Sequence, residues 1–543
     1  MTRTIRNNIK YLAVLLTVLA VSCEDLDLVP ENTFTDKNYW TSAARAESML
    51  NTAYSQLFTS GWFFYNEGLS DNAFNGRGDN EGAASIAAGT YDPSLGRIKN
   101  EWNERYKGIK SCNLLLENID RVEEMDGGLR ERYKAEARFI RAFQHFQLMT
   151  WFGDVPLLDK DPELTEAQTI SRTPRTEVLN FILEELDAAA GVLPSNTEYA
   201  EKDRGRITRG AVMAFRARVL LYEGRWEEVV ETCEALMQGN EYGSYSLYPS
   251  YDGLFLPENE YNAEDMLSLQ YVPVERTWGE FFDMVPISAG ARLNALAPTQ
   301  ELVDSYLMLN GKHIDEAGSG YDEDAPYENR DPRLTHTVVY HGYEWTEGDG
   351  SSHVINIEPG TGGTAKPDEY NPGSSASPTG YYIRKYYDPT HVDGMKSGLN
   401  LMLIRYADVL LMYAEAKNEL GQLDETVWDN TIRALRERAG FEEAGALDFN
   451  SGPGQDGLRE VIRNERRTEL AMEGLRIFDI RRWRIAEEVL NGWAHGAKFD
   501  PASPDDGYIR ANLRYFDPGK HYLWPVPRDE RQINGNLSQN PNW

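Results

Sequence analysis

The chain has 543 residues, of which 41% are hydrophobic and 26% charged, so it can bury a large core and is unlike a disordered chain. It carries 55 Lys and Arg against 87 Asp and Glu, which gives a formal charge of −32. This excess disfavours nucleic acid and anionic membrane surfaces as partners, because binding to such polyanions draws its affinity from clustered Lys and Arg.

The first 22 residues are predicted to be a signal peptide. Basic residues at positions 3, 6 and 10 precede an apolar stretch, 11–21, that is too short to span a bilayer permanently. The stretch ends in Ala-Val-Ser-Cys23, which resembles a lipobox, although Ala20 stands where leucine is usual. Such a resemblance implies that Cys23 is acylated. An ordinary signal peptide with a stray cysteine is the alternative.

Residues 23–40 are predicted to form a lipidated acidic tether. Glu24, Asp25 and Asp27 follow the cysteine at once. An acidic run in this place resembles the surface-export signal of Bacteroidota lipoproteins. No other segment is apolar for long enough to cross a membrane, so the lipid is expected to be the only anchor, at the outer face of the outer membrane. The remaining cysteines, Cys112 and Cys233, are expected to be buried thiols.

Two parts of the chain, 41–239 and 401–490, carry helical patterns. Apolar residues recur at helical spacing over 139–149, and Thr173 before Pro174 is typical of a helix start. Thr208 is predicted to cap another helix, which ends near Gly224. The next helix is expected to begin near Trp226.

Two short stretches resemble the turn of a tetratricopeptide repeat. They are 220–226, where Gly224 precedes Trp226, and 410–421, which ends in Leu-Gly. Degenerate repeats of this kind stack pairwise, so the sequence predicts a mainly α protein with about four helical pairs. We expect these helices and the C-terminal segment, 491–543, to form one domain over 41–543.

The stretch between the two helical parts, 240–400, is a predicted loop-rich insert. It is rich in Gly, Pro, Tyr, Asp and Ser and has little regular period. Its frequent Tyr and Trp favour a packed insert over a disordered linker. Loops on a rigid body often carry a binding surface, so we expect ligand binding here.

Motifs in a fixed order over nearly the whole chain resemble those of the SusD/RagB-like outer-membrane lipoproteins. The segments that carry this resemblance are Tyr39-Trp40, Asn51-Thr52-Ala53-Tyr54, Trp151-Phe152-Gly153-Asp154-Val155-Pro156, Asp331-Pro332-Arg333-Leu334, Arg463-Asn464-Glu465-Arg466-Arg467, Leu523-Trp524-Pro525-Val526-Pro527 and Asn540-Pro541-Asn542-Trp543. Most of these residues are expected to be structural, with Arg and Glu in ion pairs and Asp331-Pro332-Arg333 in a turn that contains a salt bridge.

The resemblance implies a fold, a partner and a function. SusD-like proteins sit as a lid on a SusC-like TonB-dependent transporter, with their ligand face toward it. We therefore expect a non-catalytic glycan-binding protein that delivers oligosaccharide or polysaccharide to such a partner. No nucleotide-binding loop occurs, and the sequence gives no reason to expect a cofactor, a metal or nucleic acid.

A sugar ring needs a flat aromatic surface beside carboxylates, amides and guanidinium groups. The segment 61–91 offers this combination and resembles the family loop that contacts bound sugar. The candidate residues carried over from that resemblance, with Trp62 added from the aromatic pattern, are Trp62, Asp71, Asn72, Arg77, Asp79 and Tyr91. Phe63 and Phe64 are expected in the core, and for Trp62 a place in the core and a place at the ligand surface are both open.

A second candidate place is the polar segment Glu275-Arg276-Thr277-Trp278-Gly279, and Trp278 is the strongest single stacking candidate. Tyr343 and Trp345 form a weaker third set, for which loop packing is the alternative role. Two other functions stay open: a RagB-like peptide receptor and a surface glycoside hydrolase, which would need two carboxylates across a cleft.

Overall fold

The computed structural model describes residues 39–239 and 241–543. The predicted signal peptide, the predicted lipidation site Cys23 and nearly all of the predicted acidic tether lie outside the described residues. None of the described helices is long and apolar enough to cross a membrane.

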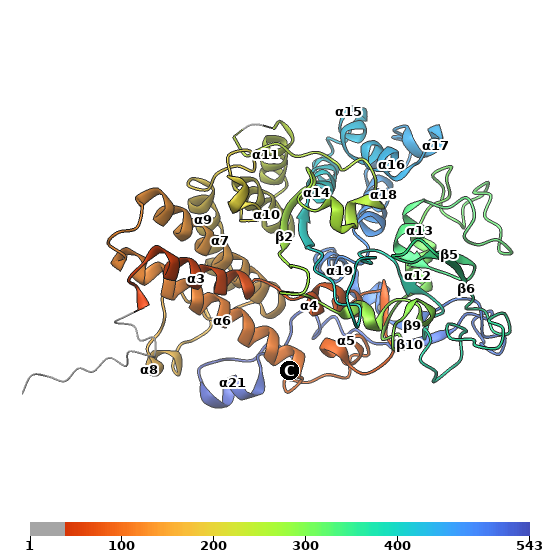
Figure 1. Ribbon diagram of the computed structural model, residues 1–543, viewed down its shortest axis with the longest axis horizontal. Coiled ribbons are helices and arrows are strands. Elements are labelled where there is room, and N and C mark those ends of the chain that lie inside the picture. Colours follow the sequence, from red (N-terminus) through yellow and green to blue (C-terminus); the bar gives the residue numbers. More distant parts are fainter. Residues whose placement is uncertain (1–38, 240) are drawn as a thin grey trace, which may run out of the picture.

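Six long helices form the N-terminal part of the scaffold, drawn in red to yellow-green in Figure 1. They are α3 (Ala43–Ser55), α6 (Gly96–Asn118), α7 (Gly127–Phe152), α9 (Arg175–Ala190), α10 (Arg209–Tyr222) and α11 (Trp226–Met237). Each packs against its neighbours in the order α3, α6, α7, α9, α10, α11. The short helix α8 (Leu164–Ala167) lies between α7 and α9 in the chain.

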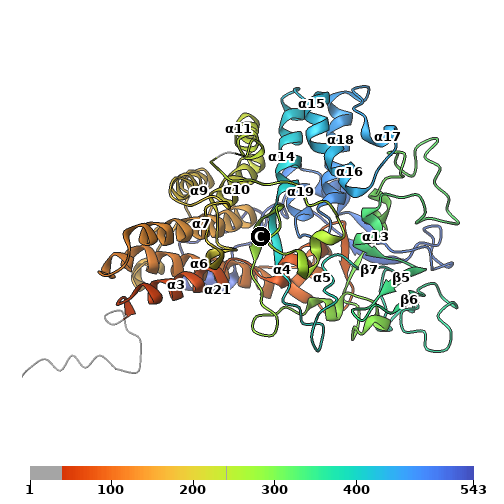
Figure 2. The ribbon, with the colours of Figure 1, turned by 45° about the horizontal axis from the view of Figure 1, so that its top comes forward.

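A second group of helices continues this stack from a distant part of the chain. It contains α14 (Tyr406–Glu419), α15 (Glu425–Trp428), α16 (Ala434–Ala439), α17 (Ala444–Leu447), α18 (Gly454–Glu469), α19 (Arg476–Arg482) and α20 (Ala486–Val489). Helix α14 packs against α11 on one side and α18 on the other, as Figure 2 shows. The mainly helical scaffold drawn from two separated parts of the sequence is thereby confirmed.

The helix boundaries follow the predicted signals with one exception. Thr208 accepts a hydrogen bond from the amide of Ala211 (3.0 Å), and Gly224 has φ 65°, a left-handed conformation that favours glycine in the turn between α10 and α11. Thr173 is not a helix cap: its backbone pairs with Val155, and α9 begins only after Pro174. The β-bridge holds Thr173 outside the helix.

The insert consists of short elements joined by loops. Its helices are α12 (Gln300–Ser305) and α13 (Arg333–Thr337), and its strands are β2 (Asp265–Leu269), β3 (Leu296–Pro298), β4 (Val338–Val339), β5 (Tyr343–Thr346), β6 (Ser352–Ile355) and β7 (Tyr382–Ile383). Among the described residues every sheet has two antiparallel strands, paired β1–β3, β2–β8, β4–β7, β5–β6 and β9–β10. Strand β1 (Ala73–Asn75) follows the helix α4 (Ser60–Tyr65) and precedes α5 (Ala83–Ala87), and β8 (Leu401–Arg405) leads into α14.

A buried network of ion pairs fixes the insert to the scaffold. Glu469, at the end of α18, accepts hydrogen bonds from Arg405 (2.6 Å), Arg333 (2.9 Å) and Arg438. Arg333 also pairs with Asp331 at 2.8 Å, so the turn and salt bridge predicted for this motif are confirmed. All of these ion-paired side chains are almost wholly buried.

The C-terminal segment runs along the scaffold and closes it. Strands β9 (Gly492–His495) and β10 (Arg510–Arg514) form a ribbon, and α21 (Arg528–Ile533) follows. Trp524 stacks on Trp151 of α7 with ring centroids 3.9 Å apart, and its amide donates to the carbonyl of Trp151 (2.7 Å). This contact holds the end of the chain against a central scaffold helix.

The ribbon is anchored by one histidine between two carboxylates. His495 Nδ1 lies 2.8 Å from Glu301 of α12, and Nε2 lies 2.9 Å from Asp505. Hydrogen bonds to both carboxylates raise the pKa of His495 from 6.5 to about 9. The imidazole is therefore charged at neutral pH, and each ring nitrogen donates a proton.

We expect this anchor to be lost at alkaline pH. Because the pKa of the folded state is raised, the stabilisation is fully present below about pH 6.5 and disappears as the pH rises through about 9. Urea unfolding at a series of pH values should show a steeper loss of stability over this window in the wild type than in His495→Gln. Equal slopes for the two proteins would contradict the proposed anchor.

Candidate functional site

The predicted ligand loop begins with a tryptophan that is buried. Thr59 caps α4 by accepting from the amide of Trp62 (3.1 Å), and this helix directs Trp62 inward, where 3% of it is exposed. Its indole N–H donates to Glu81 (2.9 Å), and the guanidinium of Arg105 lies 4.5 Å from the ring centroid. Of the two roles left open for Trp62, the structure favours the core, because an arginine and core helices cover the ring. Phe63 and Phe64 lie in the core, as predicted.

The side chains of Asp71 and Asn72 likewise form ion pairs and hydrogen bonds within the protein. The Asp71 carboxylate pairs with Arg476 (2.8 Å) and Arg467 (3.1 Å), and these guanidinium groups hold its pKa well below the usual range against the opposing effect of burial. Asn72 donates to Glu67 (3.0 Å) and accepts from Arg467 (2.8 Å). Both side chains are buried, which argues against the sugar contacts predicted for them. Their arginine partners come from α18 and α19, some 400 residues away in the chain.

Trp278 is also a core residue, 3% exposed. Its indole donates to the carbonyl of Leu399 (2.7 Å), and its ring packs against Phe64 and Phe281, with both centroid distances 5.2 Å. The segment before it does lie in a loop, but a β-bridge to Ser397 turns the ring inward. The structure therefore joins Trp278 to the α4 segment through the core and corrects the prediction of an exposed stacking ring.

Three other candidates differ in exposure. Tyr91 is buried between His521 and Trp543, so it is a packing residue. Trp345 is wholly buried and Tyr343 half-buried. Packing, the alternative role for these two, is what the structure favours.

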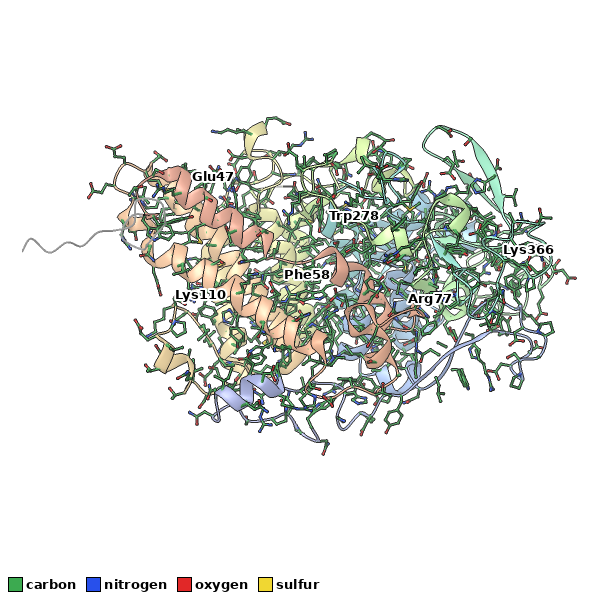
Figure 3. All side chains as sticks on the ribbon, turned by 60° about the horizontal axis from the view of Figure 1, so that its bottom comes forward. Glu47, Phe58, Arg77, Lys110, Trp278 and Lys366 are labelled. Atoms are coloured by element: carbon green, nitrogen blue, oxygen red, sulfur yellow. The ribbon has the colours of Figure 1, made fainter. Side chains whose placement is uncertain are left out.

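Arg77 and Asp79 are the predicted contacts that reach the surface, and Figure 3 marks Arg77. Asp79 accepts from the hydroxyl of Ser85 (2.5 Å) and from its amide (3.2 Å). Arg77 is half-buried, and its Nε has no hydrogen-bond partner in the described structure. Arg77 and Asp79 therefore stay candidate polar contacts. None of the predicted aromatic residues near them in the sequence offers an exposed ring.

Because Trp278 is buried, its substitution should change the stability of the fold. We expect Trp278→Phe to lower the free energy of unfolding by about 1–2 kcal/mol, because it removes the buried hydrogen bond to Leu399 and some packing volume. Chemical denaturation measures this change. Trp493→Phe is the matched control, since Trp493 is 39% exposed and should change stability by less than about 0.5 kcal/mol. Equal effects in the two variants would contradict the buried role.

A shallow hollow of about 750 Å³ borders the predicted second segment. Val274 and Thr277 line it together with residues 391–396, and Phe282 is its single aromatic side chain. This hollow lacks the paired aromatic surfaces that sugar recognition favours.

A different cavity gathers aromatic and polar side chains on the surface of the insert. It has a volume of about 530 Å³. The aromatic residues that line it, here called the tyrosine cavity, are Tyr321, Tyr327, Tyr340, Tyr381, Phe499 and Tyr508. The first four belong to the insert and the last two to the loop between β9 and β10, so the cavity lies where two separate parts of the chain meet.

Two of these rings form a stacked pair. Tyr327 and Tyr340 lie with ring centroids 4.0 Å apart and planes inclined by 17°, and both are half-buried. The hydroxyl of Tyr327 lies 3.3 Å from that of Tyr381, which donates to Gln300 (2.6 Å). The pair is thus a fixed aromatic surface with phenol groups at its edge.

The loop that carries Tyr321 and Tyr327 is held in place by Arg330. This buried guanidinium donates to the carbonyls of Pro326 (2.8 Å), Val303 (2.7 Å) and Tyr306 (2.8 Å). The hydrogen bonds tie the loop to α12. Because backbone carbonyls satisfy the arginine, it positions the aromatic rings without lining the cavity itself.

Charged groups surround the rings. Glu323, Asp324 and Glu358 are exposed carboxylates in the lining, and Lys498 lies 2.8 Å from Asp506. Burial raises the pKa of Tyr321 to about 12, so its hydroxyl stays protonated and can both donate and accept. The cavity therefore combines apolar ring faces with several hydrogen-bonding groups.

The sequence alone did not single out these residues. Tyr321 and Tyr327 stand in an acidic loop with Gly320 before it, a pattern that could have marked an aromatic and carboxylate site. Phe499 and Tyr508 carry no such signal, because only the fold brings the C-terminal loop beside the insert. Within residues 39–239 and 241–543 no group of three His, Cys, Asp or Glu side chains is placed to hold a metal ion.

Comparison with known protein families gives two matches. The model described as the SusD family matches residues 269–543, and the model described as starch-binding associating with outer membrane matches residues 47–221. Among individual proteins, the SusD-like protein P2 of Formosa agariphila is 25% identical, over 98% of both chains.

Solved structures share the fold. A SusD-like carbohydrate binding protein from Bacteroides fragilis is 30% identical, with a TM-score of 0.82 over 92% of this chain and 100% of the other. A second SusD-like protein from the same species is 27% identical, with a TM-score of 0.79 over 94% and 99%. These similarities extend over the helical scaffold and the insert together.

Proposed function

The chain belongs to the SusD family, and on this premise we propose that it is a cell-surface receptor that captures oligosaccharide or polysaccharide without cleaving it. The observation that carries the proposal is the tyrosine cavity, in which a stacked pair of half-buried rings stands among carboxylates and phenols. The carbohydrate binding named for the Bacteroides fragilis relative supports it.

The chemistry of the cavity suits a sugar. A sugar ring presents C–H groups on its faces and hydroxyls at its rim, so an aromatic face removes apolar area from water while polar neighbours replace hydrogen bonds to water. Tyr327 and Tyr340 supply the aromatic surface, and Glu323, Asp324 and Glu358 accept from hydroxyl groups. A cavity of about 530 Å³ is within the usual size range of small-molecule sites.

Two further parts of the proposal concern how the protein is anchored and how the glycan is delivered. We propose that Cys23 carries the lipid that holds the protein at the outer face of the outer membrane, and that a SusC-like TonB-dependent transporter receives the glycan. The acidic residues after Cys23 and the family description of outer-membrane association support this. Arg77 and Asp79 are proposed as additional polar contacts on the surface of the protein.

Calorimetry tests the proposal. Purified protein is titrated with a panel of neutral oligosaccharides and, separately, with a peptide mixture. We expect heat from at least one oligosaccharide and none from peptides. After long incubation, chromatograms of the bound sugar should stay unchanged. Heat from peptides alone would support a peptide receptor instead, and new, shorter sugars would support a glycoside hydrolase.

A further inference from the structure

A second cavity, of about 730 Å³, lies where the end of α7, the segment before α9, the end of α10, helix α19 and the C-terminal segment meet. It shares no lining residue with the tyrosine cavity. The arginines that line it are Arg172, Arg175, Arg481, Arg482 and Arg484. Only two carboxylates, Asp154 and Glu223, line it with them, although the chain as a whole carries a charge of −32.

The guanidinium groups of three of the five arginines have several hydrogen-bond partners within the protein. Arg175 forms a bidentate pair with Glu223, and Arg482 pairs with Glu415 through its two terminal guanidinium nitrogens. Arg172 is held by neutral acceptors: it donates to the carbonyls of Asp154 (2.7 Å) and Phe152 (2.8 Å) and to the side chain of Asn540 (2.6 Å). These contacts are structural and leave Arg172 without a charged partner.

Arg481 and Arg484 share with Arg172 the lack of a charged partner among the described residues, but their side chains make fewer hydrogen bonds than those of the other three arginines. In the part of the chain that the structure describes, neither has a carboxylate within 4.0 Å. Arg481 is only 8% exposed: it donates to the carbonyl of Tyr522, and its guanidinium lies 4.5 Å from the ring centroid of Trp151. Arg484 is exposed and lies 4.2 Å from the ring centroid of Tyr522.

A buried cation without a counter-ion is costly. Burial lowers the pKa of Arg481 to about 10, yet the side chain stays charged at neutral pH. Arg484 has φ +60°, a left-handed conformation that costs a residue with a side chain about 1 kcal/mol or more. The fold thus keeps an uncompensated guanidinium and a strained neighbour at the edge of one open cavity.

We infer that this cavity is a binding site for an oxyanion, a carboxylate or sulfate group, with Arg481 and Arg484 as its counter-ions. The planar fork of arginine matches the two oxygens of such a group, and the low exposure of Arg481 strengthens the interaction. The source of the anion is either a free inorganic ion or a charged sugar. The inference goes beyond the proposed function, because it needs no contact with the tyrosine cavity.

Titration of the full-length mature protein with sodium sulfate, sodium glucuronate and glucose at low ionic strength tests the inference. Sulfate or glucuronate should bind, and glucose should not bind at this cavity. Arg484→Ala should weaken anion binding by about ten-fold or more, since it removes one of two counter-ions. Because Arg484 is exposed, this variant should fold, and thermal unfolding checks that it does.

Two controls isolate the cavity. Arg528→Ala removes an exposed arginine that does not line it and should leave anion affinity unchanged. Tyr327→Ala should also bind the anion normally, so failure of the glycan site and failure of this site are distinguishable. Tighter binding of glucuronate than of sulfate would support an acidic sugar as the source, and the reverse would support a free ion. Absence of anion binding, or equal affinity in Arg484→Ala, would overturn the inference.

Discussion

Replacing Glu469 with glutamine is expected to lower the free energy of unfolding by about 3–5 kcal/mol, the usual result of removing one member of a buried ion-pair network. Glutamine keeps the volume of the side chain, so the change isolates the charge. Urea or guanidinium denaturation of the purified variant measures the effect.

The expected loss of stability is large because the single carboxylate of Glu469 forms ion pairs with three cations. Glu469 accepts from Arg333, Arg405 and Arg438, and these three arginines come from α13, β8 and α16. Their guanidinium groups hold the pKa of Glu469 well below its usual range, although burial opposes this. Without the charge, the three buried cations share fewer negative partners and repel one another.

Glu460 provides the matched control on the same helix. Its carboxylate is 72% exposed and lies 3.3 Å from Arg463, so Glu460→Gln should change stability by less than about 0.5–1 kcal/mol. A Glu469→Gln variant as stable as Glu460→Gln would contradict the role of the network in fixing the insert to the scaffold.

Tyr327→Ala is expected to weaken glycan binding by about 2–3 kcal/mol, on the order of 30- to 150-fold in dissociation constant. The substitution removes one ring of the stacked pair and leaves Tyr340 without its partner at 4.0 Å. The loss should appear in calorimetry with the oligosaccharide that binds the wild type most tightly.

Tyr515→Ala serves as the control for this change. Tyr515 is 56% exposed and does not line the tyrosine cavity, so its removal should leave glycan affinity unchanged. Tyr327→Phe should retain most of the affinity, since it keeps the ring and loses only the hydroxyl. Equal weakening by Tyr327→Ala and Tyr515→Ala would place the ligand elsewhere.

Much of the fold could be predicted from the sequence because its signals are local. The cap at Thr208 and the glycine turn before Trp226 depend on neighbouring residues, and both are present. The insert was recognisable from its glycine, proline and tyrosine content. The helix cap predicted at Thr173 is absent, because a β-bridge to Val155, 18 residues earlier, fixes the backbone conformation of Thr173.

The site was harder to predict, because burial depends on contacts between distant parts of the chain. Asp71 is of a residue type that often contacts ligands, but Arg476, 405 residues away in the chain, neutralises its charge. Trp278 stands in a polar segment and nevertheless enters the core. Conversely, Phe499 and Tyr508 line the tyrosine cavity only because the β9–β10 loop reaches the insert. Local composition pointed to aromatic and polar side chains, but the fold buries several of those that it singled out.

A crystal structure of the protein with the tightest-binding oligosaccharide would test the central claim most directly. We expect a sugar ring in the tyrosine cavity, with a ring face against Tyr327 or Tyr340 and hydroxyls toward the surrounding carboxylates. Sugar bound on another face, for example beside Arg77 and Asp79, with the tyrosine cavity empty, would contradict it.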